Sequence, residues 1–229
     1  MTDIYLIRHG QASFGEQNYD RLSPLGIRQS ETLGRWLADA GIRFDAVYSG
    51  ERERQRDTAT IALAHSDQSQ APLLVDPAFN ELDADRLLQY AIPRLVLREP
   101  SLATMLLDLK GNRDRFRRVF ERVVDEWVEG GWDAAGIGRW EEFRRRVFDG
   151  IRGLPERHPS VQRIAVFTSG GPITATLQSL TPDAGRGLDW GIANTSITRL
   201  RRDASGDWLL LGRREIPHLE DAADLLTHL

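Results

Sequence analysis

The sequence predicts an α/β fold in which helices connect neighbouring strands. Two observations support this prediction: short apolar runs alternate with segments of helical spacing, and the first run is apolar throughout. That first run, residues 4–7, is typical of a strand buried on both faces of a parallel sheet. The 229 residues suit one domain, 1–229, formed by a core with an elaborated insertion.

Helix and strand alternate through the first third of the chain. A helix begins at about Pro24, a residue favoured in the first turn, and Gly41 is a suitable C-terminal stop. Residues 46–48 form a second short strand, residues 54–64 a helix rich in alanine and threonine, and residues 73–75 a third strand. This order favours crossover connections within one sheet.

Residues 87–157 break this alternation. Two stripes of aromatic and aliphatic residues at helical spacing predict two main helices joined by a glycine-rich connection. We interpret the segment as a helical insertion packed over the sheet. Strands resume at residues 164–167, 196–200 and 208–211. The last two are predicted to form a hairpin with its turn at Ser205-Gly206.

Composition excludes several function classes. The net charge of −4 argues against a protein built to neutralise nucleic-acid phosphates. The absence of cysteine removes disulfides, thiolate nucleophiles and cysteine-based zinc sites. The N-terminal segment lacks the pattern of a signal peptide, and no apolar run is long enough to span a bilayer. We therefore expect a cytoplasmic protein that binds neither nucleic acid nor a membrane.

Arg8, His9 and Gly10 follow the first strand, at the sheet edge where ligands of α/β proteins bind. A histidine there can act as nucleophile, base or metal ligand. Arg8 disfavours a metal cation and favours an anion, and Gly10 lets a ligand approach the backbone. Arg-His-Gly is a weak motif by itself, and a partly buried structural histidine is the alternative.

A second arginine and a second tip add to this edge. The strand at residues 46–48 leads to Arg54 in the first turn of a helix, and two arginines near a helix N-terminus suit a phosphoryl group. Ser169 stands between the strand at residues 164–167 and Gly170-Gly171. Its side chain is expected to reach a bound anion, to cap the following helix, or to do both, because a capping hydroxyl can point into the same space.

Five segments in this order resemble the histidine phosphatase superfamily, in its phosphoglycerate mutase-like branch: LIRHGQAS, YDRLSPLGIRQSETLGRWL, VYSGERERQRDTATIAL, FNELDADRL and VFTSGGPI. The resemblance covers most of the chain and implies a three-layer α/β/α fold with a mainly parallel sheet. It also implies that His9 accepts a phosphoryl group and that Arg8 and Arg54 bind the phosphate. Arg54 is chosen because the family arginine lies one helical turn before Thr58-Ala59.

The same resemblance implies further site residues. Glu81 matches the acid that protonates the leaving oxygen, with Asp83 and Asp85 as rivals in sequence and an exposed loop carboxylate as the alternative. Ser169 replaces the family's second histidine, which contacts the phosphoryl oxygens opposite the nucleophile. The sequence departs from the family pattern there, and a neutral hydroxyl is a weaker donor than an imidazolium. Three residues are expected to contact substrate: Gln11, Ser13 and Gly170.

The resulting expectation is a metal-independent phosphohydrolase that needs no cofactor. It would act on a small phosphomonoester through a phosphohistidine at His9. A weakened family member that binds phosphate esters as a sensor or interaction module is the alternative, and a phosphomutase is a third. The sequence does not identify the phosphorylated substrate. It allows a homodimer as well as a monomer.

Overall fold

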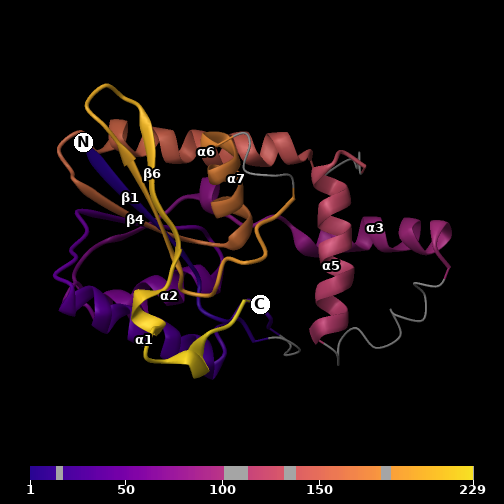
Figure 1. The fold of residues 1–229 in the computed structure, drawn as a ribbon, viewed down its shortest axis with the longest axis horizontal. Helices are drawn as coiled ribbons and strands as arrows, with labels where there is room; N and C mark the ends of the chain where they lie inside the picture. Colours follow the sequence, from indigo (N-terminus) through magenta and orange to yellow (C-terminus); the bar gives the residue numbers. More distant parts are fainter. Residues whose placement is uncertain (14–17, 101–112, 132–137, 182–186, 229) are drawn as a thin grey trace.

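The computed structural model describes residues 1–13, 18–100, 113–131, 138–181 and 187–228 (Figure 1). Within them, six strands form one sheet in the order β3-β2-β4-β1-β5-β6. The strands are β1 (Thr2–Arg8), β2 (Ala46–Ser49), β3 (Leu73–Val75), β4 (Arg163–Thr168), β5 (Ile197–Arg202) and β6 (Trp208–Glu215). β3, β2, β4 and β1 run parallel, and β5 and β6 add an antiparallel edge. The predicted mainly parallel sheet is thereby confirmed.

The main helices of the described residues are α1 (Pro24–Asp39), α2 (Glu53–Ala64), α3 (Ala84–Arg98), α5 (Arg113–Val128), α6 (Trp140–Arg157) and α7 (Gly170–Leu180). Three short 3₁₀ turns accompany them: η1 (Pro77–Phe79), η2 (Pro217–Leu219) and η3 (Ala223–Leu225). None of the helices in this part of the chain is long and apolar enough to cross a membrane.

The two faces of β1 lead to two cores, as strand alternation requires. Tyr5 and Ile7 belong to a core with residues of α1 and α2. Ile4 and Leu6 belong to a core on the opposite face with residues of α6 and α7. The fold is therefore three layers, α/β/α, as expected.

A third core lies in the helical insertion. It joins buried residues of α3 and α5 with the N-terminal half of α6, and the Trp127 and Trp140 rings meet edge to face at 5.5 Å. α6 then continues onto the sheet, where Ile151 and Leu154 join the core beneath it. Figure 1 shows α3 and α5 standing beyond the sheet while α6 connects both parts. The predicted glycine-rich connection falls partly on residues 132–137, outside the described residues.

Two local signals fix the ends of α1. The Ser23 hydroxyl accepts from the Gly26 amide at 3.0 Å, so Ser23 caps the helix just before Pro24. Gly41 has φ +63°, a left-handed conformation suited to glycine after a helix.

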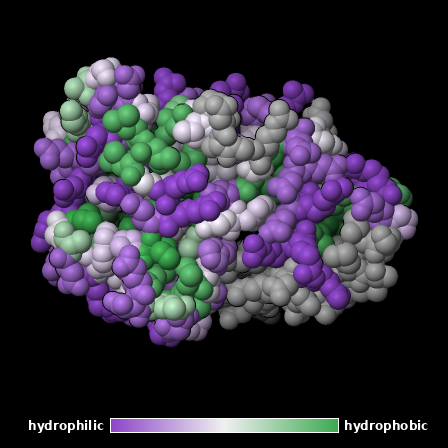
Figure 2. All heavy atoms as spheres, in the orientation of Figure 1, coloured by the Kyte–Doolittle hydropathy of each residue, from purple (hydrophilic) through white to green (hydrophobic). Residues whose placement is uncertain are grey.

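The edge strand β6 carries an exposed apolar surface. Leu209, Leu210 and Leu211 are all exposed on it, and Figure 2 shows apolar side chains gathered over this part of the molecule. β6 also extends to Glu215, beyond the predicted end at residue 211, because the pairing with β5 continues past an irregularity in register.

Candidate active site

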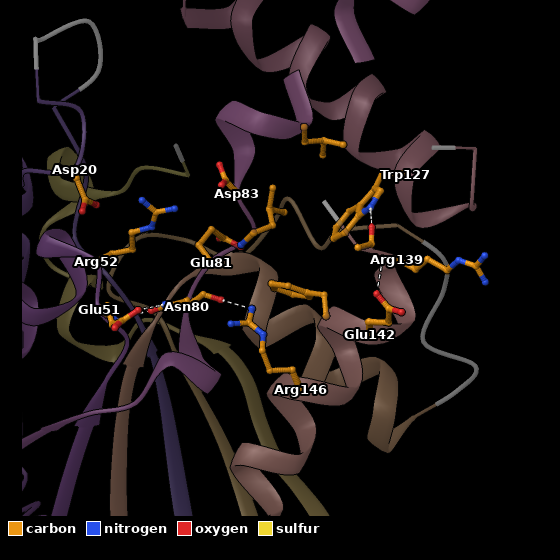
Figure 3. A pocket seen from close by; sticks show the side chains of 14 residues that line it. Asp20, Glu51, Arg52, Asn80, Glu81, Asp83, Trp127, Arg139, Glu142 and Arg146 are labelled. Atoms are coloured by element: carbon orange, nitrogen blue, oxygen red, sulfur yellow. Dashed lines mark hydrogen bonds between the residues drawn. The ribbon is translucent and has the colours of Figure 1, made fainter. Parts of the chain in front are cut away.

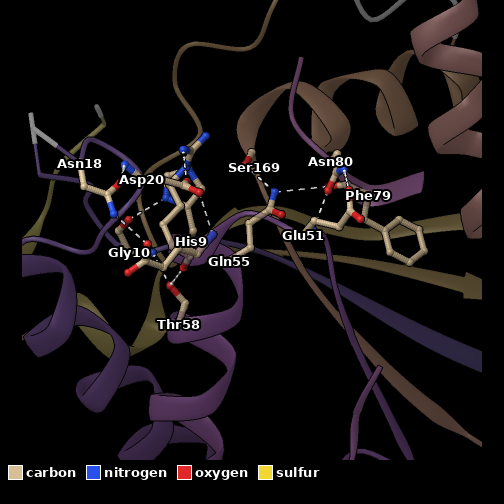
Figure 4. A network of polar contacts seen from close by, with 12 residues as sticks. His9, Gly10, Asn18, Asp20, Glu51, Gln55, Thr58, Phe79, Asn80 and Ser169 are labelled. Carbon is tan, nitrogen blue, oxygen red and sulfur yellow. Dashed lines mark hydrogen bonds and ion pairs between the residues drawn. The ribbon is translucent and has the colours of Figure 1, made fainter. Parts of the chain in front are cut away.

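His9 follows β1 directly and is only 6% exposed. Its Nδ1 lies 2.7 Å from the carbonyl oxygen of Gly10, and its Nε2 lies 3.0 Å from Nε of Arg54 (Figure 4). A carbonyl only accepts a hydrogen bond and a guanidinium only donates one, so Nδ1 carries the proton and Nε2 presents a lone pair. The geometry therefore fixes the neutral ring with Nε2 unprotonated.

Electrostatics keep this ring neutral. Burial lowers the pKa of His9 well below its usual value, and the positive charges of Arg54 and Arg8 lower it further. The hydrogen bond to Gly10 acts in the opposite direction but is the smaller effect. His9 thus retains a nucleophilic nitrogen at neutral pH.

Arg8 places a donor at the start of α7. Its Nη1 donates to the carbonyl of Ile192 and, at 2.8 Å, to that of His228. Its Nε atom is buried and has no hydrogen-bond partner among the described residues. A Cβ atom on Gly170 would lie 3.9 Å from that Nε. Burial lowers the pKa of Arg8 to about 10, which leaves it a cation at neutral pH.

Arg54 lies in the first turn of α2 and is 8% exposed. Besides contacting His9, it forms an ion pair with Asp20, from Nη1 to Oδ1 at 2.6 Å. The Tyr19 ring centre lies 5.6 Å from its guanidinium carbon. Asp20 and Tyr19 thus set the orientation of Arg54.

Gly10 is needed for packing rather than for space beside a ligand. A Cβ there would lie 2.6 Å from the carbonyl oxygen of Gly26 in α1. The Gly10 amide donates to the Thr58 hydroxyl at 2.9 Å, which ties the turn after β1 to α2. The expected room for a ligand beside Gly10 is therefore occupied by α1.

Ser169 is 0% exposed and occupies the N-cap position of α7. Within the described residues its side chain makes no capping hydrogen bond. Its hydroxyl instead accepts from Nε2 of Gln55 at 2.7 Å (Figure 4). The helix-cap interpretation of the hydroxyl is therefore not what the structure shows.

Glu81 reaches the start of α7. Its two carboxylate oxygens accept from the amides of Gly171 at 3.2 Å and Leu82 at 2.9 Å. Asp83, one rival, is exposed and caps α3 by accepting from the Arg86 amide. Asp85, the other, is exposed in the first turn of α3. Only Glu81 of these three has a hydrogen bond to α7 among the described residues.

The expected substrate contacts Gln11 and Ser13 are buried in the turn between β1 and α1. The Gln11 side-chain oxygen accepts from the Ser23 hydroxyl at 2.9 Å, which links it to the cap of α1. The Ser13 amide donates to the Arg21 carbonyl at 2.8 Å. These contacts show how the turn is held, and a role toward substrate stays a prediction.

A family model for the histidine phosphatase superfamily (branch 1) matches residues 4–93 and 106–213. The chain belongs to the histidine phosphatase superfamily. A broad-specificity phosphatase of Saccharomyces cerevisiae is 33% identical over 210 residues, which cover 85% of this chain and 77% of the yeast protein. A 2,3-bisphosphoglycerate-dependent phosphoglycerate mutase of Bartonella quintana is 34% identical over a shorter stretch, 35% of this chain and 42% of its own length.

Solved structures show the same fold for this histidine phosphatase superfamily member. Phosphoglycerate mutase from Bacillus anthracis matches with a TM-score of 0.67 at 20% identity, over 95% of each chain. The alpha-ribazole phosphatase of Shigella flexneri matches with a TM-score of 0.60 at 18% identity, over 93% of this chain and 96% of the other. At sequence identities of 18% and 20%, this similarity shows a shared fold and is not evidence of a shared function.

Several residues that sequence reasoning missed support the site of this superfamily member. Asn194 donates to the His9 carbonyl at 3.0 Å, and the Thr195 amide donates to the Arg8 carbonyl at 3.1 Å. Thr195 is fully buried with φ +59°, an uncommon conformation for a β-branched residue. Its hydroxyl contacts Nε2 of His218 at 2.9 Å. No sequence pattern marks Asn194 or Thr195, and the segment Ile216-Pro217-His218-Leu219 does not by itself indicate the contact of His218 with Thr195.

The site adjoins a cavity of about 580 Å³ (Figure 3). Asp20 and Glu81 line it, whereas His9 and Arg8 do not. The cavity therefore lies beside the His9 site, and these two carboxylates lie between the cavity and the site. Within the residues that the structure describes, no three His, Cys, Asp or Glu side chains gather as a metal site.

Proposed function

We propose that this member of the superfamily is a phosphohydrolase that cleaves a phosphomonoester through a phosphohistidine at His9, without a metal ion. The observation that carries the proposal is the state of the His9 ring. Its Nδ1 proton is held by Gly10, and its Nε2 lone pair faces Arg54. This is the tautomer and the charge state that a nitrogen nucleophile needs.

In the proposed reaction, Nε2 of His9 attacks phosphorus while the bond to the leaving oxygen breaks. The electron pair of that bond goes to the leaving oxygen, which takes a proton from Glu81. Water then attacks the phosphohistidine, Glu81 accepts the water proton, and the N–P electron pair returns to Nε2. The sum is ester plus water giving alcohol plus inorganic phosphate, with both side chains restored.

The arginines supply the positive charge that this reaction needs. The unpartnered Nε of Arg8 is a buried donor without an acceptor, which a phosphoryl oxygen would satisfy. Nε of Arg54 donates to Nε2 of His9 in the free protein. When Nε2 bonds to phosphorus, that donor is released for a phosphoryl oxygen. Both guanidinium groups thus stabilise charge on the transferred group.

Ser169 supplies one neutral donor in this proposal. Its oxygen accepts from Gln55, which leaves the hydroxyl hydrogen to donate toward the phosphoryl group. A neutral donor is roughly half as strong as a charged one. The reaction would therefore keep a donor at this position, at a reduced strength. Gly170 would contribute its amide at the start of α7.

The relatives support hydrolysis over other outcomes. The yeast relative that covers most of this chain is named a broad-specificity phosphatase. The phosphoglycerate mutase of Bartonella quintana shares only the shorter stretch, 35% of this chain. We therefore place hydrolysis ahead of phosphoryl transfer to a second substrate.

A steady-state assay with p-nitrophenyl phosphate in the presence of EDTA tests the proposal. The wild-type protein should release phosphate, and His9→Ala should lose the activity. His65→Ala is the matched control, because His65 is an exposed histidine at the end of α2. Phosphate release by His9→Ala at the wild-type rate would refute the proposal. Binding of vanadate without turnover of any ester would support the sensor alternative instead.

A further inference from the structure

The cavity beside the phosphoryl site is placed to receive the leaving group. This step rests on the proposed function, in which Glu81 gives a proton to the leaving oxygen. Glu81 contacts the start of α7 through the Gly171 amide and also lines the cavity. The leaving oxygen must lie within reach of Glu81, so the rest of the alcohol extends into the space that Glu81 borders. Figure 3 shows Glu81 at the wall between the sheet edge and the helical insertion.

The cavity is large and has an apolar wall. Its volume of about 580 Å³ lies within the range of small-molecule sites, roughly 300–1,000 Å³. Leu82, Trp127 and Phe143 provide the apolar part of its wall, and each leaves a small fraction of its surface exposed. The Trp127 ring lies 6.0 Å from Phe143, and its Nε1 donates to the Gly138 carbonyl, so its orientation is fixed. This wall suits a ring or chain rather than a three-carbon acid alone.

The charges around the cavity are negative in balance. Glu81 lines it too but holds a proton in the proposed function; the other four carboxylates, Asp20, Glu51, Asp83 and Glu142, stand against three guanidinium groups, Arg52, Arg139 and Arg146. Arg146 donates to the backbone carbonyls of Pro77 at 2.6 Å and Asn80 at 3.0 Å. A second phosphate or a carboxylate on the substrate would therefore meet a net repulsive rim.

We propose that this cavity binds the leaving group and selects phosphomonoesters of bulky alcohols or phenols. The preferred leaving group carries an apolar ring or chain and has no second phosphate or carboxylate. The site would bind the transferred phosphoryl group through Arg8 and Arg54 and reject further anions at the cavity.

Three esters of primary alcohols test this proposal, because their leaving oxygens are chemically alike. They are 3-phenylpropyl phosphate, glycerol 3-phosphate and 3-phosphoglycerate. The value of kcat/KM should fall by at least about tenfold at each step in that order, for loss of apolar contact and then for added charge. Equal or higher kcat/KM for 3-phosphoglycerate would overturn the selectivity. Absence of hydrolysis for all three, and for p-nitrophenyl phosphate, would instead overturn the proposed function.

A pair of double variants tests the charge argument. Asp83→Ser keeps a capping hydroxyl for α3, and Glu51→Gln keeps an acceptor for the Asn80 amide, while together they remove two charges from the rim. The ratio of kcat/KM for 3-phosphoglycerate to that for glycerol 3-phosphate should rise about tenfold. The matched control, Asp39→Ser with Glu129→Gln, removes two exposed charges outside the cavity lining. An unchanged ratio in the rim variant, or an equal rise in the control, would overturn the proposal.

Discussion

At the scale of single residues, the His9 ring is controlled from both sides. Gly10 fixes the Nδ1 proton, and Arg54 both directs Nε2 and opposes protonation of the ring. Arg54 is in turn held by Asp20. The Asp20 carboxylate orients the Arg54 guanidinium and offsets part of its positive charge, so we infer that Asp20 positions Arg54.

Ser169, whose hydroxyl accepts from Gln55, supplies one donor in the proposed function, and substitution of Ser169 tests that role. Ser169→Ala should lower kcat about tenfold, because one net neutral hydrogen bond is lost. Steady-state kinetics on an alkyl phosphate measures this effect. A loss as complete as that of His9→Ala would make the hydroxyl essential, and wild-type kinetics would remove it from the reaction.

Ser169→His should be poorly accommodated, because Ser169 is fully buried against Gln55. Overpacking of this kind costs about 1–3 kcal/mol of unfolding free energy. Combining it with Gln55→Ala opens space and should recover much of that loss. Chemical denaturation of the single and double variants measures both effects. A single variant as stable as wild type would contradict the packing argument.

From the sequence alone, Arg8, His9 and Arg54 can be recognised as candidate site residues, but the residues that contact them cannot. Arg8, His9 and Arg54 follow strand ends in a recognisable order, whereas Asp20 and Gln55 carry no pattern that marks them. Their roles arise from contacts between segments far apart in the chain, such as the bond from Gln55 to Ser169. Single-sequence reasoning has no access to such pairs.

At the scale of elements, α7 and Glu81 are coupled through a glycine. A Cβ on Gly171 would overlap the Glu81 carboxylate, the flexible end of a side chain. Gly171→Ala should therefore displace Glu81 while costing little stability. The value of kcat/KM, which reports the steps up to phosphohistidine formation, should fall for alkyl phosphates far more than for p-nitrophenyl phosphate, whose leaving group needs no proton.

Gly153→Ala in α6 is the control for that substitution, because its Cβ would meet only the Arg157 side chain, at 4.0 Å. It should raise stability by about 0.5–1 kcal/mol and leave the leaving-group dependence unchanged. An equal fall in kcat/KM for both esters in Gly171→Ala would contradict the role of Glu81 as the acid.

The elements themselves were largely predictable. The bounds of α1 follow from Pro24 and Gly41, and the strand at residues 73–75 was predicted as observed. The double packing of α6 was not predictable, because its continuous apolar stripe does not say which half meets the sheet and which meets α3 and α5.

At the scale of the whole molecule, residues near the C-terminal end of the chain hydrogen-bond to Arg8 and to two residues that contact the backbone of Arg8 and His9. Thr227 bonds to the Asn194 side chain at 2.9 Å, the His228 carbonyl accepts from Arg8, and His218 contacts Thr195. Because the Thr195 hydroxyl donates to a carbonyl, His218 must donate through Nε2, and burial lowers the pKa of His218 so that the ring is neutral at neutral pH. The fold of the chain end and the geometry of His9 are therefore linked.

The burial of His218 makes the free energy of unfolding depend on pH. Burial lowers the pKa of His218 to about 4, whereas an unfolded histidine titrates near 6.5. Between these values only the unfolded state binds the proton, so stability falls as pH falls from about 6.5 to 4. His218→Gln keeps a donor and removes this titration. The decrease in unfolding free energy from pH 7.5 to pH 5 should be about 2 kcal/mol smaller in His218→Gln than in wild type. Equal decreases in urea denaturation would contradict this account.

The central claim is that His9 carries the phosphoryl group, and rapid-quench labelling tests it most directly. Wild-type protein mixed with a ³²P-labelled phosphomonoester should give an acid-labile, base-stable phosphoprotein within the first turnover. Peptide mapping under alkaline conditions should locate the label on the peptide that contains His9, and His65→Ala should label as wild type does. Labelling of His9→Ala to the wild-type level, or an acid-stable label on another residue, would contradict the account.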